Sequence, residues 1–314
     1  MWFKNLIVYR LPRGWDISAE TLDERLRAHA FVPASSIEET SSGWVPPRES
    51  SPLLAHAVQG QVLVALRQEK KLLPAKVVAQ MVRQRAEQIE EAEGFKPGRK
   101  RMKELKEQVR DELLPRAFSL SSDTRAWIDR ANGWLVIDAA SAARAEELLG
   151  LLARCIEGFP ARPLRVAGSV AGTMTAWLTA DEPPAGFTVD QDVELKARGG
   201  KATVRYANQS LEQEDIARHT KAGKECTKLA LTWADRVSFL LTDRLEIRRI
   251  RPLDVLKEGA DAGAEGDADE RFDSDMVLMT GELARLLDDL VDALGGEPVQ
   301  AQAGAVTPPA VAAA

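Results

Sequence analysis

Residues 96–118 combine basic and apolar side chains at a spacing that could bind an anion. The stretch reads KPGRKRMKELKEQVRDELLPRAF and opens with seven cations among few acids. At helical pitch one set of cations and one set of apolar residues form separate stripes, roughly 85° apart. Lysine and arginine displace counterions from nucleic acid, so such a stripe can track phosphates. The cations are Arg99, Lys103, Lys106 and Arg110, and the apolar residues are Met102, Leu105, Val109 and Leu113.

The same pattern also fits a solvated amphipathic helix, which is what most charge runs are. Pro115 ends the helix, and the chain leaves it through Phe118. From the residues alone, burial in the core is the expected fate of Phe118, although an exposed aromatic beside a helix end can anchor a partner. Both interpretations of the stretch remain open at this point.

A helix over residues 76–93, broken by Gly94, Pro97 and Gly98, precedes the basic helix. Two helices joined by a short Gly/Pro turn predict a hairpin that projects as an arm from a sheet body. That body is predicted on both sides of the arm. It comprises strands at 2–11, 61–67 and 134–137, helices at 16–30 and 142–155 with Ser141 as the cap of the latter, and a tight turn at Asn132-Gly133.

The second half of the chain predicts another α+β unit. Its clearest signal is the Gly199-Gly200 pair inside residues 193–206, which indicates a β-hairpin. The acidic, Gly/Ala-rich residues 259–270 predict a flexible loop, and the residues after Gly295 predict a disordered tail. The remaining predicted elements are a helix at 173–180, a helix capped by Ser210 and ending at His219, strands at 226–241 and 245–250 joined at Asp243, a strand at 276–279 and a helix at 282–294.

The formal charge of −6 over 314 residues argues at first against a nucleic-acid partner. However, residues 258–270 contain six acids and no base, so the rest of the chain is neutral. Local potential matters more than the total, and a neutral body with a basic arm can bind a polyanion.

Composition indicates a soluble globular protein of the cytoplasm. Cys155 and Cys226 lie in apolar patterns and predict small buried side chains rather than a disulfide. The first residues, MWFKNLIVYRLPR, lack the features of a signal peptide, and no run reaches the length of a membrane span. No cofactor is expected.

Catalytic signals in the sequence are weak. His29, His56 and His219 stand alone and predict surface or packing roles rather than a metal site. The best enzyme candidate is Glu194 and Lys196 on a predicted strand, with Asp181 upstream, a set that could hold Mg²⁺ in a nuclease. Such a pattern arises easily by chance in a charged chain. A second alternative is a regulator whose basic arm meets an acidic protein.

Several blocks of sequence, in order from residue 1 to about residue 297, resemble the recombination-associated protein RdgC family. The resemblance covers nearly the whole chain, and several blocks in register make it specific. The blocks are MWFKNL at 1–6, GWVPP at 43–47, LLPRAFS at 113–119, WID at 127–129, GK at 223–224, TKLAL at 227–231, RFD at 271–273 and LMTGEL at 278–283.

The resemblance implies a DNA-binding protein without sequence preference and without enzymatic activity. The family forms a ring-shaped homodimer around double-stranded DNA in the nucleoid and restrains RecA-promoted strand exchange. It implies that Phe118 lies at the dimer interface. It also implies DNA contacts at Arg99, Lys100 and Arg101 in the arm, at Gln209 in a hairpin finger and at Lys224, to which the basic stripe adds Lys103. Where relatives carry lysine in the finger, this chain has Ala207 and Asn208, so the arm should carry more of the binding.

Taken together, the sequence predicts an α+β fold with antiparallel sheets, flanking helices and an inserted helical-hairpin arm, assembled as a ring-shaped homodimer. The partners expected are double-stranded DNA, with single-stranded DNA as a further possibility, and a second copy of the chain, acting against RecA and without a membrane. Four regions are expected: a central domain of residues 1–75 and 119–167, the arm at 76–118, a C-terminal domain at 168–296 and the tail at 297–314.

Overall fold

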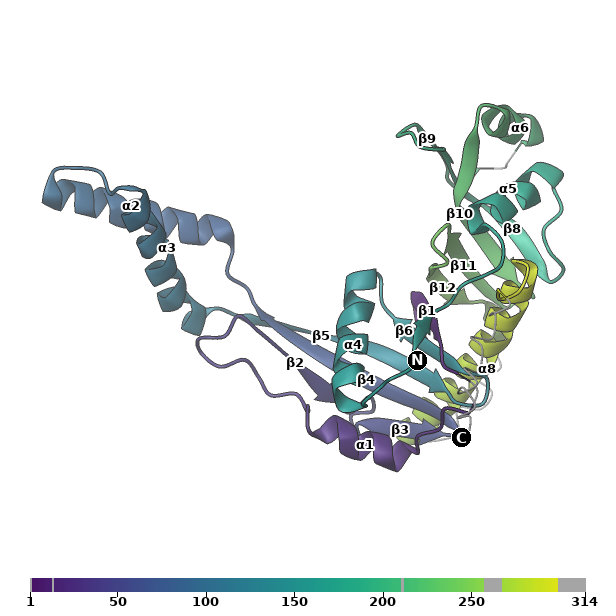
Figure 1. Cartoon of the computed structure of the whole chain (residues 1–314), viewed down its shortest axis with the longest axis horizontal. Coiled ribbons are helices and arrows are strands. Elements are labelled where there is room, and N and C mark those ends of the chain that lie inside the picture. The colour runs from purple at the N-terminus through teal and green to yellow at the C-terminus, as the bar shows by residue number, and fades with distance from the viewer. Residues whose placement is uncertain (1, 13, 210–211, 257–266, 299–314) are drawn as a thin grey trace, which may run out of the picture. The chain divides into compact units, whose positions relative to one another are not determined.

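The computed structural model describes residues 2–12, 14–209, 212–256 and 267–298. By its internal contacts the chain divides into two compact units. We call residues 9–161 and 266–273 the hairpin unit, and residues 1–8, 162–265 and 274–314 the groove unit. Each consists of antiparallel strands with helices packed on them, which confirms the predicted α+β class with antiparallel sheets (Figure 1).

The sheet of the hairpin unit is built on two long strands. β4 (Gln61–Lys71) and β5 (Ser119–Asp129) are antiparallel and pair along their whole length, from Gln61 opposite Asp129 to Lys71 opposite Ser119. Residues 62–66 are all buried, so both faces of the sheet are covered there. β2 (Thr40–Val45) and β3 (Ala55–Val58) pair with β4, and β6 (Trp134–Asp138) pairs with β5.

Two helices pack in the core of this unit. α1 (Ala19–Arg27) begins at Ser18, whose hydroxyl accepts a hydrogen bond from the N–H of Thr21 at 3.1 Å. α4 (Ala142–Cys155) has the predicted bounds, although Ser141 makes no side-chain capping bond. The indole Nε1 of Trp44 lies 3.3 Å from the sulfur of Cys155, and burial raises the pKa of that thiol. Cys155 is therefore a buried core residue, as predicted.

A pair of helices is inserted between β4 and β5. α2 (Ala75–Glu93) ends at Gly94, which has a left-handed φ of 79°, and α3 (Arg99–Leu113) begins at Gly98. The two helices pack on each other and follow the ends of β4 and β5 in Figure 1. Their shared core is small, because only four side chains in it are buried. These are Val78, Val82, Leu105 and Val109, flanked by the partly buried Met81, Met102 and Leu113.

That core fixes the orientation of the basic helix. The predicted apolar stripe of α3 does pack against α2, because Leu105 and Val109 are buried and Met102 and Leu113 lie beside them. Burying one such side chain stabilises the fold by about 1.5–3 kcal/mol, so four of them hold the 47-residue insertion at 72–118 only modestly. With one stripe packed, the cations of α3 face solvent.

The groove unit contains a second run of antiparallel strands. Its strands lie in the order β12–β11–β10–β8–β9, and residue Leu6 of β1 (Leu6–Arg10) pairs with Ile247 of β12. β8 and β9 form the hairpin predicted around Gly199-Gly200. The elements are β7 (Arg162–Pro163), α5 (Val170–Ala180), β8 (Phe187–Ala197), β9 (Thr203–Tyr206), α6 (Gln213–Lys221), β10 (Lys224–Trp233), β11 (Val237–Thr242), β12 (Ile247–Pro252) and α8 (Ala268–Ala293).

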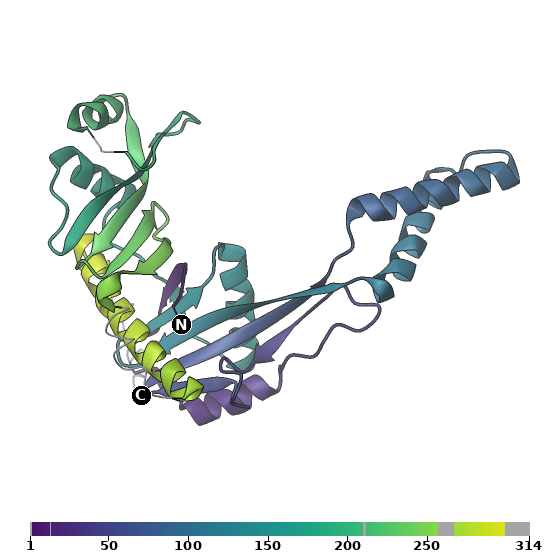
Figure 2. The same cartoon turned by 180° about the vertical axis from the view of Figure 1, so that it is seen from behind.

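The predicted strand at 276–279 and separate helix at 282–294 are wrong. α8 is one uninterrupted helix, as Figure 2 shows, and residues 268–270 of the predicted loop are its first turn. The apolar run Met276–Met279 suggested a strand, but its buried residues continue a helical spacing through Leu283, Leu286 and Leu290. Gly281 does not break the helix, because it is exposed and costs only about 1 kcal/mol there.

Three smaller differences concern turns. The predicted strand at 226–241 is two strands, because Ala234 and Asp235 both adopt a left-handed φ, near 50°, and reverse the chain without a glycine. The turn at Asn132-Gly133 is a four-residue loop in which Asn132 donates its N–H to Asp129. The N-cap residue of α6 is Glu212, and the predicted cap Ser210 lies outside the described residues, as do most of 259–270 and the tail from 299.

Cys226, in β10, is buried, as predicted from its apolar pattern. Burial raises the pKa of its thiol to about 12, so the side chain stays protonated at neutral pH. Both cysteines thus serve as small apolar core residues.

Candidate nucleic-acid interface

The end of the α2–α3 hairpin carries a cluster of exposed cations. Residues 94–103, which we call the hairpin tip, contain five cations and no acid. Arg99, Lys100 and Arg101 form the first turn of α3, and all three are exposed. Within the described residues, the side chains of Arg99 and Lys100 have no ion-pair or hydrogen-bond partner.

The ion pairs at the hairpin tip are long. Arg101 lies 3.4 Å from Glu104, and Lys103 lies 4.0 Å from Glu107, in both cases one turn along the same helix. Lys96 lies 4.0 Å from Glu90 of α2. Exposed pairs of this kind contribute about 0–1 kcal/mol. They leave the cations free to exchange an intramolecular carboxylate for another anion.

The helix dipole adds to the positive potential of the tip. Gly98 provides no side-chain cap, and the first turn of α3 contains no acid, so its N–H groups point outward beside three cations. Cations at this end of a helix are unfavourable for stability by about 0.3–1 kcal/mol each. The same arrangement favours a bound anion such as a phosphate.

The basic stripe predicted along α3 is only partly available. Arg99, Lys103 and Lys106 are exposed on one side of the helix, but Arg110 is held by Glu39 in an ion pair. Lys100 and Arg101 point to other sides, because each residue turns the helix by about 100°. The structure therefore gathers the predicted contacts around the helix start rather than along one long stripe.

Phe118 is 84% exposed, so the expectation of core burial is wrong. It lies between the short 3₁₀ helix η1 (Leu114–Arg116) and β5, where its carbonyl accepts a bond from the N–H of Leu72. Leu72 and Leu120 beside it are also exposed. The backbone of Phe118 is therefore paired while its aromatic side chain is exposed.

The two other residues implied by the resemblance lie in the groove unit. Gln209 is exposed, but it follows β9 in the connection to α6 rather than lying in the β8–β9 turn. Asn208, before it, has a left-handed φ of 51° and donates its N–H to Asp192. Lys224 begins β10 and is half-buried, with its Nζ 3.4 Å from Nδ1 of His219.

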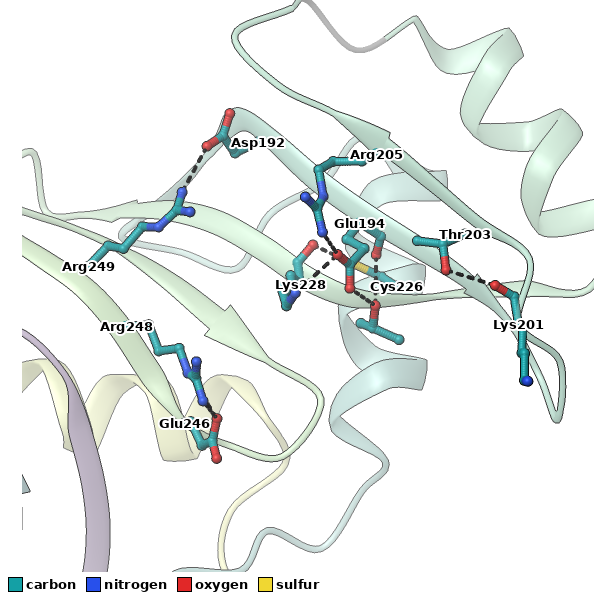
Figure 3. Close-up of polar contacts among 11 residues, drawn as sticks. Asp192, Glu194, Lys201, Thr203, Arg205, Cys226, Lys228, Glu246, Arg248 and Arg249 are labelled. Atoms are coloured by element: carbon teal, nitrogen blue, oxygen red, sulfur yellow. Dashed lines mark hydrogen bonds and ion pairs between the residues drawn. The ribbon is translucent and has the colours of Figure 1, made fainter. Parts of the chain in front are cut away.

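The residues of the nuclease alternative do not come together as a metal site. Glu194 is buried and accepts hydrogen bonds from Arg205 at 2.5 Å, Lys228 at 3.0 Å and Thr227 at 3.1 Å (Figure 3). Burial alone raises the pKa of Glu194, but these hydrogen bonds outweigh it, so the pKa lies below its usual value. Asp181 ends α5 and is exposed.

Among the described residues no three His, Cys, Asp or Glu side chains are grouped as metal ligands. The carboxylate of Glu194 already has two cations bound to it, which occupy the place that a metal ion would take. Lys196, the third residue of that alternative, is exposed on β8.

Sequence reasoning missed two groups. His56 is buried, which agrees with the predicted packing role, but the sequence did not show its partners: its Nε2 lies 2.7 Å from Asp273, and Arg48 contacts the same carboxylate at 3.2 Å. The arginines of β12, in the run Arg248-Arg249-Ile250-Arg251, were also overlooked. Three arginines in four residues of a strand are a signal that the sequence did contain.

The fold and the site together define an α+β protein that presents exposed cations on a helical hairpin and a sheet. This chain belongs to the RdgC family: the family model described as "Putative exonuclease, RdgC" matches residues 1–297. Proteins named "Recombination-associated protein RdgC" are similar over 298 residues, which is 95% of this chain and 99% of each relative. That of Bordetella parapertussis is 55% identical and that of Herminiimonas arsenicoxydans is 56% identical.

None of the helices in the described residues combines the length and apolar character needed to cross a membrane. The match at the family level agrees with the resemblance found in the sequence, and it covers both units.

Proposed function

We propose that this protein binds double-stranded DNA without sequence preference and acts in recombination as a passive clamp. The observation that supports this proposal most directly is the first turn of α3, where Arg99, Lys100 and Arg101 lie at a positive helix end without an acid in that turn. These residues can contact backbone phosphates, which carry no sequence information. The family's name associates its members with recombination.

We further propose a ring-shaped homodimer in which the α2–α3 hairpin acts as an arm and Phe118 anchors the partner. An exposed phenylalanine flanked by exposed Leu72 and Leu120 is an apolar surface that a second copy could bury. In a two-fold ring, each basic surface would occur twice at the central hole, once from each copy. DNA held inside such a ring is unavailable for strand invasion, which would restrain RecA without enzymatic activity, in the nucleoid of the cytoplasm.

The test is the affinity for a fluorescein-labelled duplex, measured by anisotropy across a salt series. For the wild type we expect a steep log–log slope. Lys100→Glu/Arg101→Glu removes two phosphate contacts and should lower the slope by about 1.8, at about 0.9 per contact, and the affinity by about 30-fold or more at 0.15 M salt. The control Lys76→Glu/Arg83→Glu reverses two exposed cations on α2 of the same hairpin and should bind like the wild type.

A flat salt slope for the wild type would contradict DNA binding and favour a regulator with an acidic protein partner. The description of the family as an exonuclease calls for a separate assay. DNA degradation that requires Mg²⁺ and is abolished by Glu194→Ala would overturn the proposal of a non-catalytic clamp.

A further inference from the structure

The sheet of the groove unit has one face packed by helices and one face that remains accessible. The packed face carries Val193, Leu229 and Leu231. The hydroxyl of Thr175 in α5 accepts a hydrogen bond from the N–H of Cys226, and the carboxylate of Asp289 in α8 accepts one from the indole N–H of Trp233. The other side chains along these strands point to the accessible face, and most of them are polar, although Ala230 and Leu240 also lie there. They include Asp190, Asp192 and Glu194 of β8, Arg205 of β9, Lys228 and Thr232 of β10 and Ser238 of β11.

A β-bulge in β12 adds three arginines to this face. Ser238 is opposite Arg251 and Leu240 is opposite Arg248, so two steps along β11 match three steps along β12. The extra residue is Arg249, whose φ of 55° lies in the left-handed region, where a long side chain is unfavourable. A regular strand would turn residues 248 and 250 to one side.

With the bulge, Ile247 and Ile250 stay buried, while Arg248, Arg249 and Arg251 reach the accessible face. The N–H of Arg249, outside the regular ladder, is directed at Oδ1 of Asn5 at 3.4 Å. Backbone strain at a bulge that re-aims charged side chains is a feature of functional surfaces.

The charges of this face are layered. Two of the carboxylates are nearly covered: the side chains of Glu194 and Glu246 are 12% and 14% exposed. The cations bound to them reach outward, since Arg205 is 67% exposed and Lys228 and Arg248 are each 37% exposed. Arg249, at 68% exposure, lies 3.5 Å from Asp192, whose side chain is itself 36% exposed (Figure 3).

Arg251 completes the set. It is exposed, and among the described residues its side chain has no ion-pair or hydrogen-bond partner. A ligand approaching from solvent therefore meets the guanidinium groups of Arg205, Arg249 and Arg251 before it meets the carboxylates of Glu194 and Glu246. The carboxylates hold four of the cations in place, which reduces the entropy lost when they bind an anion.

The cations line two adjoining hollows that share Asp192, Leu240 and Arg249. One hollow also contains Arg251 and Asn208, and the other contains Arg205, Lys228 and Arg248. Both are open to solvent, and their cations come from β9, β10 and β12. Charges spread along an open groove suit a chain of phosphates better than a single small anion.

We propose that this groove binds the sugar-phosphate backbone of nucleic acid, as a second contact separate from the hairpin tip. The proposal rests on the proposed DNA-binding function and adds Arg249 and Arg251, with Arg205, Lys228 and Arg248, to its contact residues. The carboxylates are positioning residues that orient the cations and do not touch the ligand.

The experiment compares full-length Arg249→Gln/Arg251→Gln with the wild type by duplex anisotropy across a salt series. Loss of two contacts should lower the slope by about 1.8 and the affinity by about 30-fold at 0.15 M salt. The control is Arg285→Gln, which removes a cation of similar exposure, 63%, from α8 on the packed side. It should bind like the wild type.

The outcomes separate this proposal from the proposed function. If the wild type binds DNA and the Lys100→Glu/Arg101→Glu variant is weakened, but Arg249→Gln/Arg251→Gln binds like the wild type, the groove proposal is overturned and the function stands. If the wild type does not bind duplex DNA with a salt slope, both fall. Saturable binding of inorganic phosphate to the groove in calorimetry, lost in Arg249→Gln/Arg251→Gln without a change in DNA affinity, would make it a small-anion site and overturn the proposal.

A second variant guards against misfolding. Arg249→Gly fits a φ of 55° without a side-chain clash, so its melting temperature should not fall below that of the wild type, whereas Arg249→Val should lower it. Weaker DNA binding by a folded Arg249→Gly protein supports the proposal, and unchanged binding contradicts it.

Discussion

The hairpin tip and the groove face present positive charge in opposite ways. At the tip, Arg99 and Lys100 lie on a helix that is supported by four buried side chains and have no partner among the described residues. On the groove face, Arg205 and Lys228 are bound to the buried carboxylate of Glu194. The tip thus leaves these two cations without a fixed position. On the groove face, part of the positive charge neutralises acids, and these ion pairs hold the cations in fixed positions.

This difference predicts different costs of substitution. Cations in the first turn of α3 are unfavourable for stability, so removing them should weaken binding without lowering the stability of the fold. Charges on the face are part of a network with a buried acid, so changing the acid should alter folding as well. Stability and affinity are therefore expected to be separable in the hairpin and coupled in the groove.

The largest effect is expected when both regions are changed together. Lys100→Glu/Arg101→Glu combined with Arg249→Gln/Arg251→Gln removes four phosphate contacts, which corresponds to about 1,000-fold in duplex affinity at 0.15 M salt. If the regions act independently on one duplex, the logarithms of the two separate losses add, as a double-mutant cycle by anisotropy can show. A combined loss no greater than that of the tip variant alone would mean that only the tip contacts DNA.

The next largest effect concerns the exposed phenylalanines at the two ends of the hairpin rather than its charged residues. Burying Phe118 in a two-fold interface would contribute about 1.5–3 kcal/mol per copy, so Phe118→Ala should weaken the dimer at least 100-fold. Sedimentation equilibrium measures this directly. Phe95, 63% exposed at the tip, provides the matched aromatic control, and Phe95→Ala should leave the dimer unchanged. Equal behaviour of the two variants would contradict the assignment of Phe118 as the anchor.

A smaller effect separates the carboxylates of the two regions. Glu194→Gln removes the buried anion between Arg205 and Lys228 and should lower the free energy of unfolding by about 1–3 kcal/mol. Glu104→Gln removes the exposed partner of Arg101 and should change it by less than about 0.5 kcal/mol. Urea denaturation measures both. A stability loss at Glu104 as large as that at Glu194 would remove the distinction between mobile and fixed cations.

The sequence predicts the hairpin better than the groove because the signals of the hairpin are local. The bounds of α2 and α3 follow from helical periodicity interrupted by Gly94 and Gly98, and the stripe that packs in the hairpin core is visible in the same 15 residues. The exposure of Phe118 was not predictable in this way. The exposure of Phe118 depends on whether other segments of the chain pack over its side chain, and a local sequence pattern carries no information on that.

The groove depends on residues that are distant in sequence. Glu194 is 34 residues from Lys228, and only the register of β8 with β10 brings them together. The bulge at Arg249 was also hidden, because an arginine is not the residue type that usually marks a left-handed φ. The prediction for α8 was wrong for a different reason. A short apolar run such as Met276–Met279 fits a strand or a helix, and only the periodicity of the longer segment around it decides between them.

The smallest predicted effect is a pH dependence specific to the groove face. The pKa of Glu194 is lower in the folded state than the usual value of 4.5, so the group stabilises the fold above that value. This contribution is lost as the pH falls below 4.5 and through the folded pKa, because the protonated carboxyl no longer attracts Arg205 and Lys228. Glu194→Gln lacks the titrating group, so the difference in unfolding free energy between wild type and variant should shrink from pH 6 to pH 3. Urea denaturation at several pH values measures that difference. A constant difference would show that the hydrogen bonds of Glu194 act independently of its charge, and the face would then orient its cations by geometry alone.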